Sequence, residues 1–246
     1  MSLTRRDAIA ISGSTVAGVS LGLIGTKELD AQTPPVGQQP PQEWPSTLVE
    51  RPRREGFPAD LPLNPDGSAP EHDESEAGPI TEGNRSMWRT PDRSTPVIDY
   101  DYRNLAVRVD TRGLARLGGT LRFADLETLP IVSGTYLLQC GAPRPTGIVK
   151  WTGVRFSDFA DLLGLVDGVH YARFIASDRF YVDEDMTTLM HPQVMLAWLM
   201  NDEPIAPLHG APLRLIIPFR YGNRSIKAIQ EMIFSTPGLP RLQLPA

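Results

Sequence analysis

Cysteine is almost missing from the sequence: Cys140 is the one thiol in 246 residues. A single thiol cannot close a disulfide within the chain, and it cannot supply a multi-cysteine zinc or iron–sulfur site. The Cys-x-x-Cys-His sequence that attaches c-type haem is also missing, so the chain attaches no such haem itself. In an exported protein a lone reactive thiol requires either burial or a chemical role.

An excess of positive charge is missing as well. The chain has 24 lysines and arginines against 29 acidic residues, a net charge of -5. A nucleic-acid-binding domain needs at least a basic patch, so we expect no nucleic-acid partner. Long apolar runs are also missing: residues 8–25 are only mildly apolar and are broken by glycines. We therefore expect no stable membrane span after processing.

The first 31 residues have the features of an export signal. Arg5 and Arg6 precede the mild apolar stretch of residues 8–25, and polar residues follow. This pattern is typical of a twin-arginine signal, with Ala31 as the candidate cleavage point. The alternative is an ordinary secretory signal with a chance arginine pair. Either interpretation predicts export, and we expect the periplasm as the location.

Residues 32–79 are dense in proline, acidic and small polar residues. Such a composition buries too little apolar surface to offset the cost of ordering the chain. We predict a linker, or an arm lying on the surface of the following domain. The candidate docking points of such an arm are Trp44, Leu48, Val49 and Phe57.

Residues 80–246 are predicted to form one β-rich domain of the α+β class. Alternation or apolar composition predicts strands at residues 104–110, 120–123, 134–139, 171–176, 213–217 and 226–234. Helices are predicted at residues 124–129, from the N-cap Ser157 to Gly164, and from His191 to Asn201.

Three segments of this domain carry residues suited to chemistry. In the first, a strand ends at Gln139 and Cys140, and Trp-Thr-Gly-Val follows at residues 151–154. The second extends from residue 201 to 218, and the third is Tyr-Gly-Asn-Arg-Ser-Ile-Lys at residues 221–227. A thiolate is a soft ligand for redox metals, and a strand end followed by a Gly/Pro loop places sulfur at a rim. The alternative for Cys140 is a buried structural thiol.

The third segment has the features of an anion-binding turn. Gly222 and Asn223 permit tight backbone geometry, so amide N–H groups can converge on an anion. Arg224 and Lys227 add donors that carry positive charge. The alternative is a solvated basic loop between strands.

Together, and in this order, the three segments resemble the sulfite-oxidase family of molybdopterin enzymes. The resemblance extends over residues 105–234 and looks closest to the periplasmic methionine-sulfoxide reductase branch. It implies a domain of the sulfite-oxidase molybdopterin-binding type and a molybdenum–molybdopterin (Mo-pyranopterin) cofactor. In that family the cysteine completes the molybdenum site, so Cys140 is the expected metal ligand.

The resemblance also implies a set of cofactor-binding residues. They are Asn84, Ser177, His209, Arg214, Arg224, Ser225, Ile226 and Lys227. The family uses the segment equivalent to residues 224–227 to hold the terminal phosphate of the pterin. Structural roles are the alternatives: a linker turn for Asn84, a capped turn for His209 and an exposed strand charge for Arg214.

The cysteine loop departs from the family pattern. Many members have Cys-Ala-Gly-Asn-Arg-Arg there, whereas residues 140–145 are Cys-Gly-Ala-Pro-Arg-Pro. The resemblance therefore does not specify the substrate. Arg144 is the candidate for binding an anionic substrate, and Tyr181 is a candidate hydrogen-bond donor near the metal oxo group. We assign both, with Cys140, to the catalytic site.

The expected function is periplasmic two-electron oxygen-atom transfer at sulfur, either sulfite oxidation or sulfoxide reduction. The sequence shows neither a haem domain nor the family's immunoglobulin-like dimerisation domain, so a separate electron-transfer partner is expected, a c-type cytochrome or a membrane haem protein. One alternative is a non-catalytic binding or partner subunit with a degenerate cofactor site. Another is an unrelated exported β-rich domain. The main hypothesis requires Cys140 and residues 224–227 to bind opposite ends of one elongated cofactor.

Overall fold

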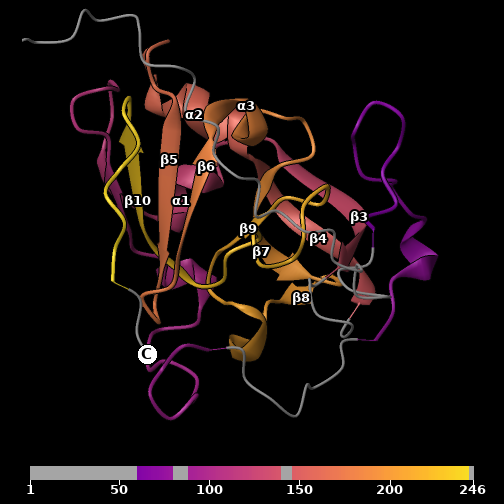
Figure 1. Ribbon diagram of the computed structural model, residues 1–246. Coiled ribbons are helices and arrows are strands. Elements are labelled where there is room, and N and C mark those ends of the chain that lie inside the picture. Colours follow the sequence, from indigo (N-terminus) through magenta and orange to yellow (C-terminus); the bar gives the residue numbers. More distant parts are fainter. Residues whose placement is uncertain (1–59, 80–87, 140–145, 244–246) are drawn as a thin grey trace, which may run out of the picture. The chain divides into compact units, whose positions relative to one another are not determined.

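The computed structural model describes residues 60–79, 88–139 and 146–243, and Figure 1 draws the other residues as a thin grey trace. The chain divides into two compact units, Met1–Pro52 and Arg53–Ala246, and every described residue lies in the second. Among the described residues, no helix is long and apolar enough to cross a membrane.

Two five-stranded sheets form the described part of the second unit (Figure 1). The strands of the first sheet, in spatial order, are β2 (Gly119–Leu121), β1 (Val107–Asp110), β10 (Ile229–Ser235), β5 (Tyr171–Ala176) and β6 (Tyr181–Asp185). β1 and β10 are parallel, and the other neighbours are antiparallel. β10, the last strand in the sequence, lies in the middle of this sheet, where it pairs with β1 on one side and β5 on the other.

The second sheet is antiparallel throughout. Its strands are β3 (Ile131–Gln139), β4 (Thr146–Arg155), β7 (Met195–Met200), β8 (Glu203–Pro204) and β9 (Arg214–Ile216). β7 is central, because β4 pairs with one of its edges and β8 and β9 pair with the other.

The approach of β4 to β7 explains one glycine of the Trp-Thr-Gly-Val segment. The register between the strands shifts between Thr152 and Gly153. A Cβ atom on Gly153 would lie 1.9 Å from the carbonyl oxygen of Leu196, so a side chain does not fit there. This glycine is therefore a packing requirement of the sheet.

The helices are short and lie at the ends of strands. The α-helices are α1 (Phe123–Leu126), α2 (Phe156–Leu163) and α3 (Met186–Leu189), and the 3-10 helices are η1 (Glu74–Glu76), η2 (Tyr102–Asn104) and η3 (Pro207–His209). The C-cap of α2 is Gly164, whose φ of 64° is the left-handed conformation common after a helix C-terminus.

An aromatic cluster connects α2 to the first sheet. The ring of Phe156 lies 5.9 Å from that of Phe159, 5.8 Å from that of Phe174 on β5 and 6.4 Å from that of Phe234 on β10. All four side chains are fully buried. Burial of large aromatic surface of this kind supplies much of the stability of a domain core.

The predicted α+β, β-rich class is confirmed, but one predicted element is wrong. The segment after His191 forms strand β7 instead of a helix. Residues 194–198 are all buried, because β7 lies between β4 and β9 and is covered on both faces. An unbroken apolar run shows no alternation of apolar and polar residues, so its sequence pattern does not distinguish a buried strand from a buried helix.

Two details of the predicted elements also differ. Helix α2 begins directly where β4 ends, so its N-cap is Arg155 and Ser157 lies inside the helix. Strands β4, β6 and β8 were not predicted; in β6 three consecutive residues are acidic, of which Asp183 and Asp185 are exposed and Glu184 is buried.

Residues 60–79 lie against the second sheet. The backbone N–H of His72 donates to the carbonyl of Thr135 on β3 at 2.9 Å, and Glu71 forms a bridge with Tyr136. The side chain of Gln193 exchanges two hydrogen bonds with the backbone of Ala69, at 2.9 and 2.8 Å. This part of the proline-rich segment is thus ordered on the surface of β3.

Candidate functional site

The connection between β8 and β9 packs against the turn that precedes β10. η3 (Pro207–His209) starts with a proline and is capped at its C-terminal end by Gly210, whose φ of 108° suits glycine. A Cβ atom on Gly210 would lie 2.6 Å from Cβ of Lys227, so the missing side chain makes room for the lysine stem. The N–H of Ala228 donates to the carbonyl of Gly210 at 2.9 Å. Two segments that the sequence keeps apart are therefore in close contact.

Arg214 on β9 connects these two segments. Its Nη1 donates to the carbonyl of His209 at 2.8 Å, and its Nε donates to the carbonyl of Ser225 at 3.2 Å. The guanidinium also lies 5.1 Å from the centroid of the Trp151 ring. Arg214 is only 7% exposed, which excludes the alternative of an exposed strand charge.

Lys227 is a partly buried cation beside Arg214. Its ammonium donates to the carbonyl of Leu208 at 3.3 Å and lies 4.0 Å from the centroid of the Trp88 ring. The pKa of Lys227 is lowered from 10.5 to about 8, mainly by burial and also by the charge of Arg214, while Asp178 opposes the shift. An anion at this point would stabilise the charged ammonium.

His209 belongs to the same group of side chains. Burial is the main cause that lowers its pKa from 6.5, and the charges of Arg214 and Lys227 add to the effect. The imidazole is therefore neutral at neutral pH, and a neutral imidazole offers one donor and one acceptor. We call Lys227, Arg214 and His209 the basic cluster.

The β5–β6 turn borders the basic cluster through the main chain. The N–H of Ser177 donates to the carbonyl of Ala228 at 3.0 Å. Within the described residues, the Ser177 hydroxyl is buried without a hydrogen-bond partner, and so is the indole N–H of Trp151. Buried polar groups normally have partners, so both are candidates for bonds to a bound molecule.

The other predicted residues of the anion-binding turn point elsewhere. Arg224 forms an ion pair with Glu184 on β6, with 2.5 Å between Nε and Oε1, and also donates to the carbonyl of Asp183. The hydroxyl of Ser225 accepts the N–H of Ile217 at 3.0 Å, and Ile226 is buried. The backbone N–H groups of residues 224–226 donate to carbonyls within the turn itself. Among the side chains of this turn, it is Lys227 that joins the basic cluster.

Tyr181 lies on the opposite face of the β5–β6 pair from the core. Its hydroxyl accepts the N–H of Leu242 at 3.2 Å, and the guanidinium of Arg173 lies 4.5 Å from its ring centroid. These neighbours belong to β5 and to the segment after β10. The structure therefore does not bring Tyr181 to the basic cluster.

Cys140, Arg144 and Asn84 lie outside the described residues. The flanking strands are described: β3 ends at Gln139, and its partner residue on β4 is Thr146. The prediction that a strand leads directly to Cys140 is thus confirmed. Among the described residues, no group of three or more His, Cys, Asp or Glu side chains is placed to hold a metal ion.

Comparison with known protein families identifies the domain. A family model described as the oxidoreductase molybdopterin binding domain matches residues 94–238, which include both sheets and the basic cluster. The chain belongs to this family. The predicted relationship to the sulfite-oxidase-type molybdopterin proteins is therefore confirmed.

The relatives of this molybdopterin-binding domain include several redox proteins. One is a protein of Azospira oryzae named as a candidate methionine-sulfoxide reductase subunit, 33% identical over 54% of this chain and 50% of the relative. Another is the catalytic subunit of the protein-methionine-sulfoxide reductase of Campylobacter jejuni, 24% identical over 60% of this chain and 55% of the relative. A third is the sulfite oxidase of Arabidopsis thaliana, 25% identical over 56% of this chain and 43% of the relative.

A solved structure supports the fold of the domain. The sulfane dehydrogenase SoxCD from Paracoccus pantotrophus matches with a TM-score of 0.52 and 17% identity, over 79% of this chain and 57% of that one. This likeness shows the fold alone. The chain spans about half the length of the curated relatives it matches.

No site role was assigned from the sequence to two aromatic residues that lie beside the basic cluster. Trp88 and Trp151 each lie against a cation of the basic cluster, and each is almost fully buried. For Trp88 the available signal was a large aromatic residue in an otherwise polar, proline-rich region. That signal does not indicate which cation the ring contacts.

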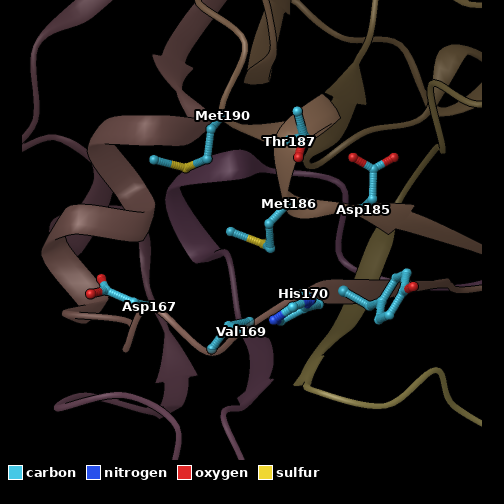
Figure 2. A pocket seen from close by; sticks show the side chains of 8 residues that line it. Asp167, Val169, His170, Asp185, Met186, Thr187 and Met190 are labelled. Carbon is cyan, nitrogen blue, oxygen red and sulfur yellow. The ribbon is translucent and has the colours of Figure 1, made fainter.

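A separate hollow lies at the start of β5 and at α3 (Figure 2). Its volume is about 430 Å³, and Met186, Met190, His170 and Asp185 are among the side chains that line it. None of the predicted cofactor residues lines it. This hollow is distinct from the basic cluster.

The lowered pKa of Lys227 predicts a dependence of stability on pH. Between pH 8 and 10.5 the unfolded chain binds a proton that the folded, cofactor-free chain has released, so the free energy of unfolding rises with pH. Below pH 8 both states are protonated, and the cost of the buried charge is fully present. We expect a rise of up to about 3 kcal/mol across this window. Denaturant unfolding of the wild type and of Lys227→Met over this pH range measures the rise in the free energy of unfolding. Equal pH profiles for the two proteins would contradict the prediction.

The Arg224–Glu184 ion pair predicts a structural role for Arg224. Replacement of Arg224 by leucine leaves the Glu184 carboxylate, 7% exposed, without its partner. We expect the free energy of unfolding to fall by about 2 kcal/mol, and the double variant with Glu184→Gln to recover part of the loss. The amount of bound pterin should stay close to that of the wild type. Loss of pterin at unchanged stability would instead support the phosphate-binding role.

Proposed function

We propose that this chain is a periplasmic molybdenum–molybdopterin oxidoreductase that transfers an oxygen atom to or from sulfur. The observation that carries the proposal is the basic cluster, in which Lys227, Arg214 and His209 meet in a domain of the molybdopterin-binding family. Two cations packed together beside a neutral imidazole, out of full contact with water, are suited to an anionic ligand.

The donors present fit a pterin that ends in a phosphate. Lys227 and Arg214 would neutralise the negative charge, and His209 would offer a neutral donor or acceptor to the ring system. The Ser177 hydroxyl and the Trp151 indole N–H are further donors whose partners are missing among the described residues. Asn84 remains a proposed contact. Arg224, Ser225 and Ile226 would support the turn that carries Lys227.

Cys140 is proposed as the protein ligand to molybdenum. Metal binding keeps a cysteine deprotonated, and a thiolate is a suitable soft ligand. When bound, the cofactor supplies the two-electron redox chemistry, and the protein supplies the ligand, the orientation and the surrounding charge. Arg144 is the proposed residue that binds an anionic substrate. Tyr181 would have to act from the outer face of β6, so its proposed catalytic role is the least supported.

Two reactions at sulfur are compatible with this assignment. Sulfite and water give sulfate, two electrons and two protons, or a sulfoxide takes up two electrons and two protons and gives a sulfide and water. Relatives named sulfite oxidase and methionine-sulfoxide reductase support both. The electrons would pass to or from a separate protein, a c-type cytochrome or a membrane haem protein. The arginine pair at residues 5 and 6 supports export by the twin-arginine route.

The decisive experiment is the analysis of full-length protein produced in a molybdate-supplied host with a working twin-arginine pathway. We expect close to one molybdenum atom and one pterin per chain, with turnover of either sulfite or methionine sulfoxide using artificial electron carriers. Protein without molybdenum would overturn the proposal. Bound molybdenum without turnover of either substrate would favour a non-catalytic partner subunit.

A further inference from the structure

Trp88 forms one wall around the Lys227 ammonium. The indole is 3% exposed, and its ring centroid lies 4.0 Å from Nζ of Lys227. A cation over an indole face is attracted by the negative charge density of the ring, more strongly where water is excluded. The contact therefore fixes the position of the ammonium.

A buried carboxylate holds the segment that carries Trp88. Asp178, 7% exposed, accepts the backbone N–H of Arg89 at 2.8 Å and that of Phe180 at 3.0 Å. The Arg89 guanidinium lies 4.7 Å from the centroid of the Phe180 ring. These contacts attach residues 88–89 to the β5–β6 turn. Each of the two carboxylate oxygens of Asp178 thus accepts a hydrogen bond from a backbone N–H group.

The surroundings of Lys227 leave its charge available to an anion. An ammonium has three N–H donors, and within the described part of the chain the Lys227 ammonium donates to the carbonyl of Leu208 at 3.3 Å. An indole attracts the ammonium without carrying a negative charge. Unlike a carboxylate, it orients the cation and does not compete with an anionic ligand.

We propose that Trp88 is a positioning residue of the cofactor site, whose indole face holds the Lys227 ammonium in the orientation that binds the anionic group of the pterin. This inference rests on the proposed function. It assigns Asp178 a supporting role, because that carboxylate holds the backbone next to Trp88. Cofactor retention should then depend on an aromatic face at residue 88 and not only on its apolar volume.

The test compares Trp88→Phe and Trp88→Leu with matched changes at Trp198. Trp198 is also 3% exposed, but its neighbours are Tyr102 and Phe123, away from the basic cluster. Pterin and molybdenum are measured in the purified full-length proteins, with thermal unfolding as the measure of stability. We expect Trp88→Leu to lose about tenfold in cofactor retention, Trp88→Phe to stay within about twofold of the wild type, and both Trp198 variants to keep the cofactor.

A double-variant cycle shows whether Trp88 acts through Lys227. If it does, Trp88→Leu should reduce retention little further once Lys227→Met is present. Additive losses would overturn the inference, as would equal losses in the leucine variants of Trp88 and Trp198. A proton NMR spectrum adds a readout without cofactor: the upfield ring-current shift of the Lys227 side chain should disappear in Trp88→Leu and persist in Trp198→Leu.

The outcomes separate the two proposals. Wild-type protein without molybdenum overturns the proposed function, and with it the role of Trp88 toward a cofactor, even if the ring-current shift is present. If the wild-type protein holds the cofactor and the Trp88 variants retain it as well as the Trp198 variants do, only the present inference is overturned.

Discussion

Replacement of Arg214 by methionine is expected to lower the free energy of unfolding by about 3 kcal/mol and to remove most of the bound cofactor. Methionine keeps the apolar stem but leaves the carbonyls of His209 and Ser225 without the donors that now bind them. It also removes the cation over the Trp151 ring. The β8–β9 connection and the turn before β10 would then no longer be joined by the hydrogen bonds of one side chain.

Denaturant unfolding and pterin analysis measure the two effects of Arg214→Met separately. Arg214→Lys is the matched control, because it keeps the charge but cannot reproduce the two-pronged hydrogen bonding of the guanidinium. We expect the lysine variant to recover less than half of the lost stability. The Arg214 charge lowers the pKa of His209, so the methionine variant should also show a raised His209 pKa by NMR. A loss of stability below about 1 kcal/mol would contradict a linking role for Arg214.

Replacement of Cys140 by serine is expected to reduce turnover by about 10³-fold or more while the chain still folds. A serine oxygen is a harder and more basic ligand than a thiolate, so it does not reproduce the electronic environment of the metal. Cys140 follows the last described residue of β3, and the strand pairing up to Gln139 does not involve its side chain. We therefore expect little change in the unfolding midpoint.

The single cysteine makes this prediction easy to check. Thiol-specific alkylation should be slow in the loaded protein and fast after the cofactor is removed, because a metal-bound thiolate is protected. Unchanged turnover in Cys140→Ser, or rapid alkylation of the loaded protein, would exclude Cys140 as the ligand. Molybdenum retained with turnover lost would exclude the non-catalytic alternative, since a degenerate site has no turnover to lose.

Local patterns predicted six of the ten described strands, but they did not predict β4, β6 or β8, and they gave a helix in place of β7. The strands at residues 134–139 and 171–176 follow directly from apolar composition and bounding turns. At β7 the same apolar residues suit a helix or a strand, and pairing with β4 and β9 decides between them. Pairs of this kind join residues far apart in the chain, so no local window contains the deciding information.

The candidate site shows the same limit. The motif that contains Arg224 and Lys227 predicts two cations for one anion, yet only Lys227 joins the basic cluster. Arg224 meets Glu184, a residue 40 positions earlier, whose carboxylate is buried and requires a partner. The sequence pattern of the turn contains no sign of this pairing.

The amino-acid sequence by itself determined the family, the single thiol available as a metal ligand, and the order of the three segments that carry the proposed site residues. Each of these depends on residue identity or on spacing along the chain. Tertiary structure alone decided which side chains meet. It placed Trp88 on Lys227, Arg214 between two carbonyls and Tyr181 on the outer face of its sheet. The reason is that the partner of a buried charge is set by how distant strands pack, and the cost of leaving such a charge without a partner selects one arrangement.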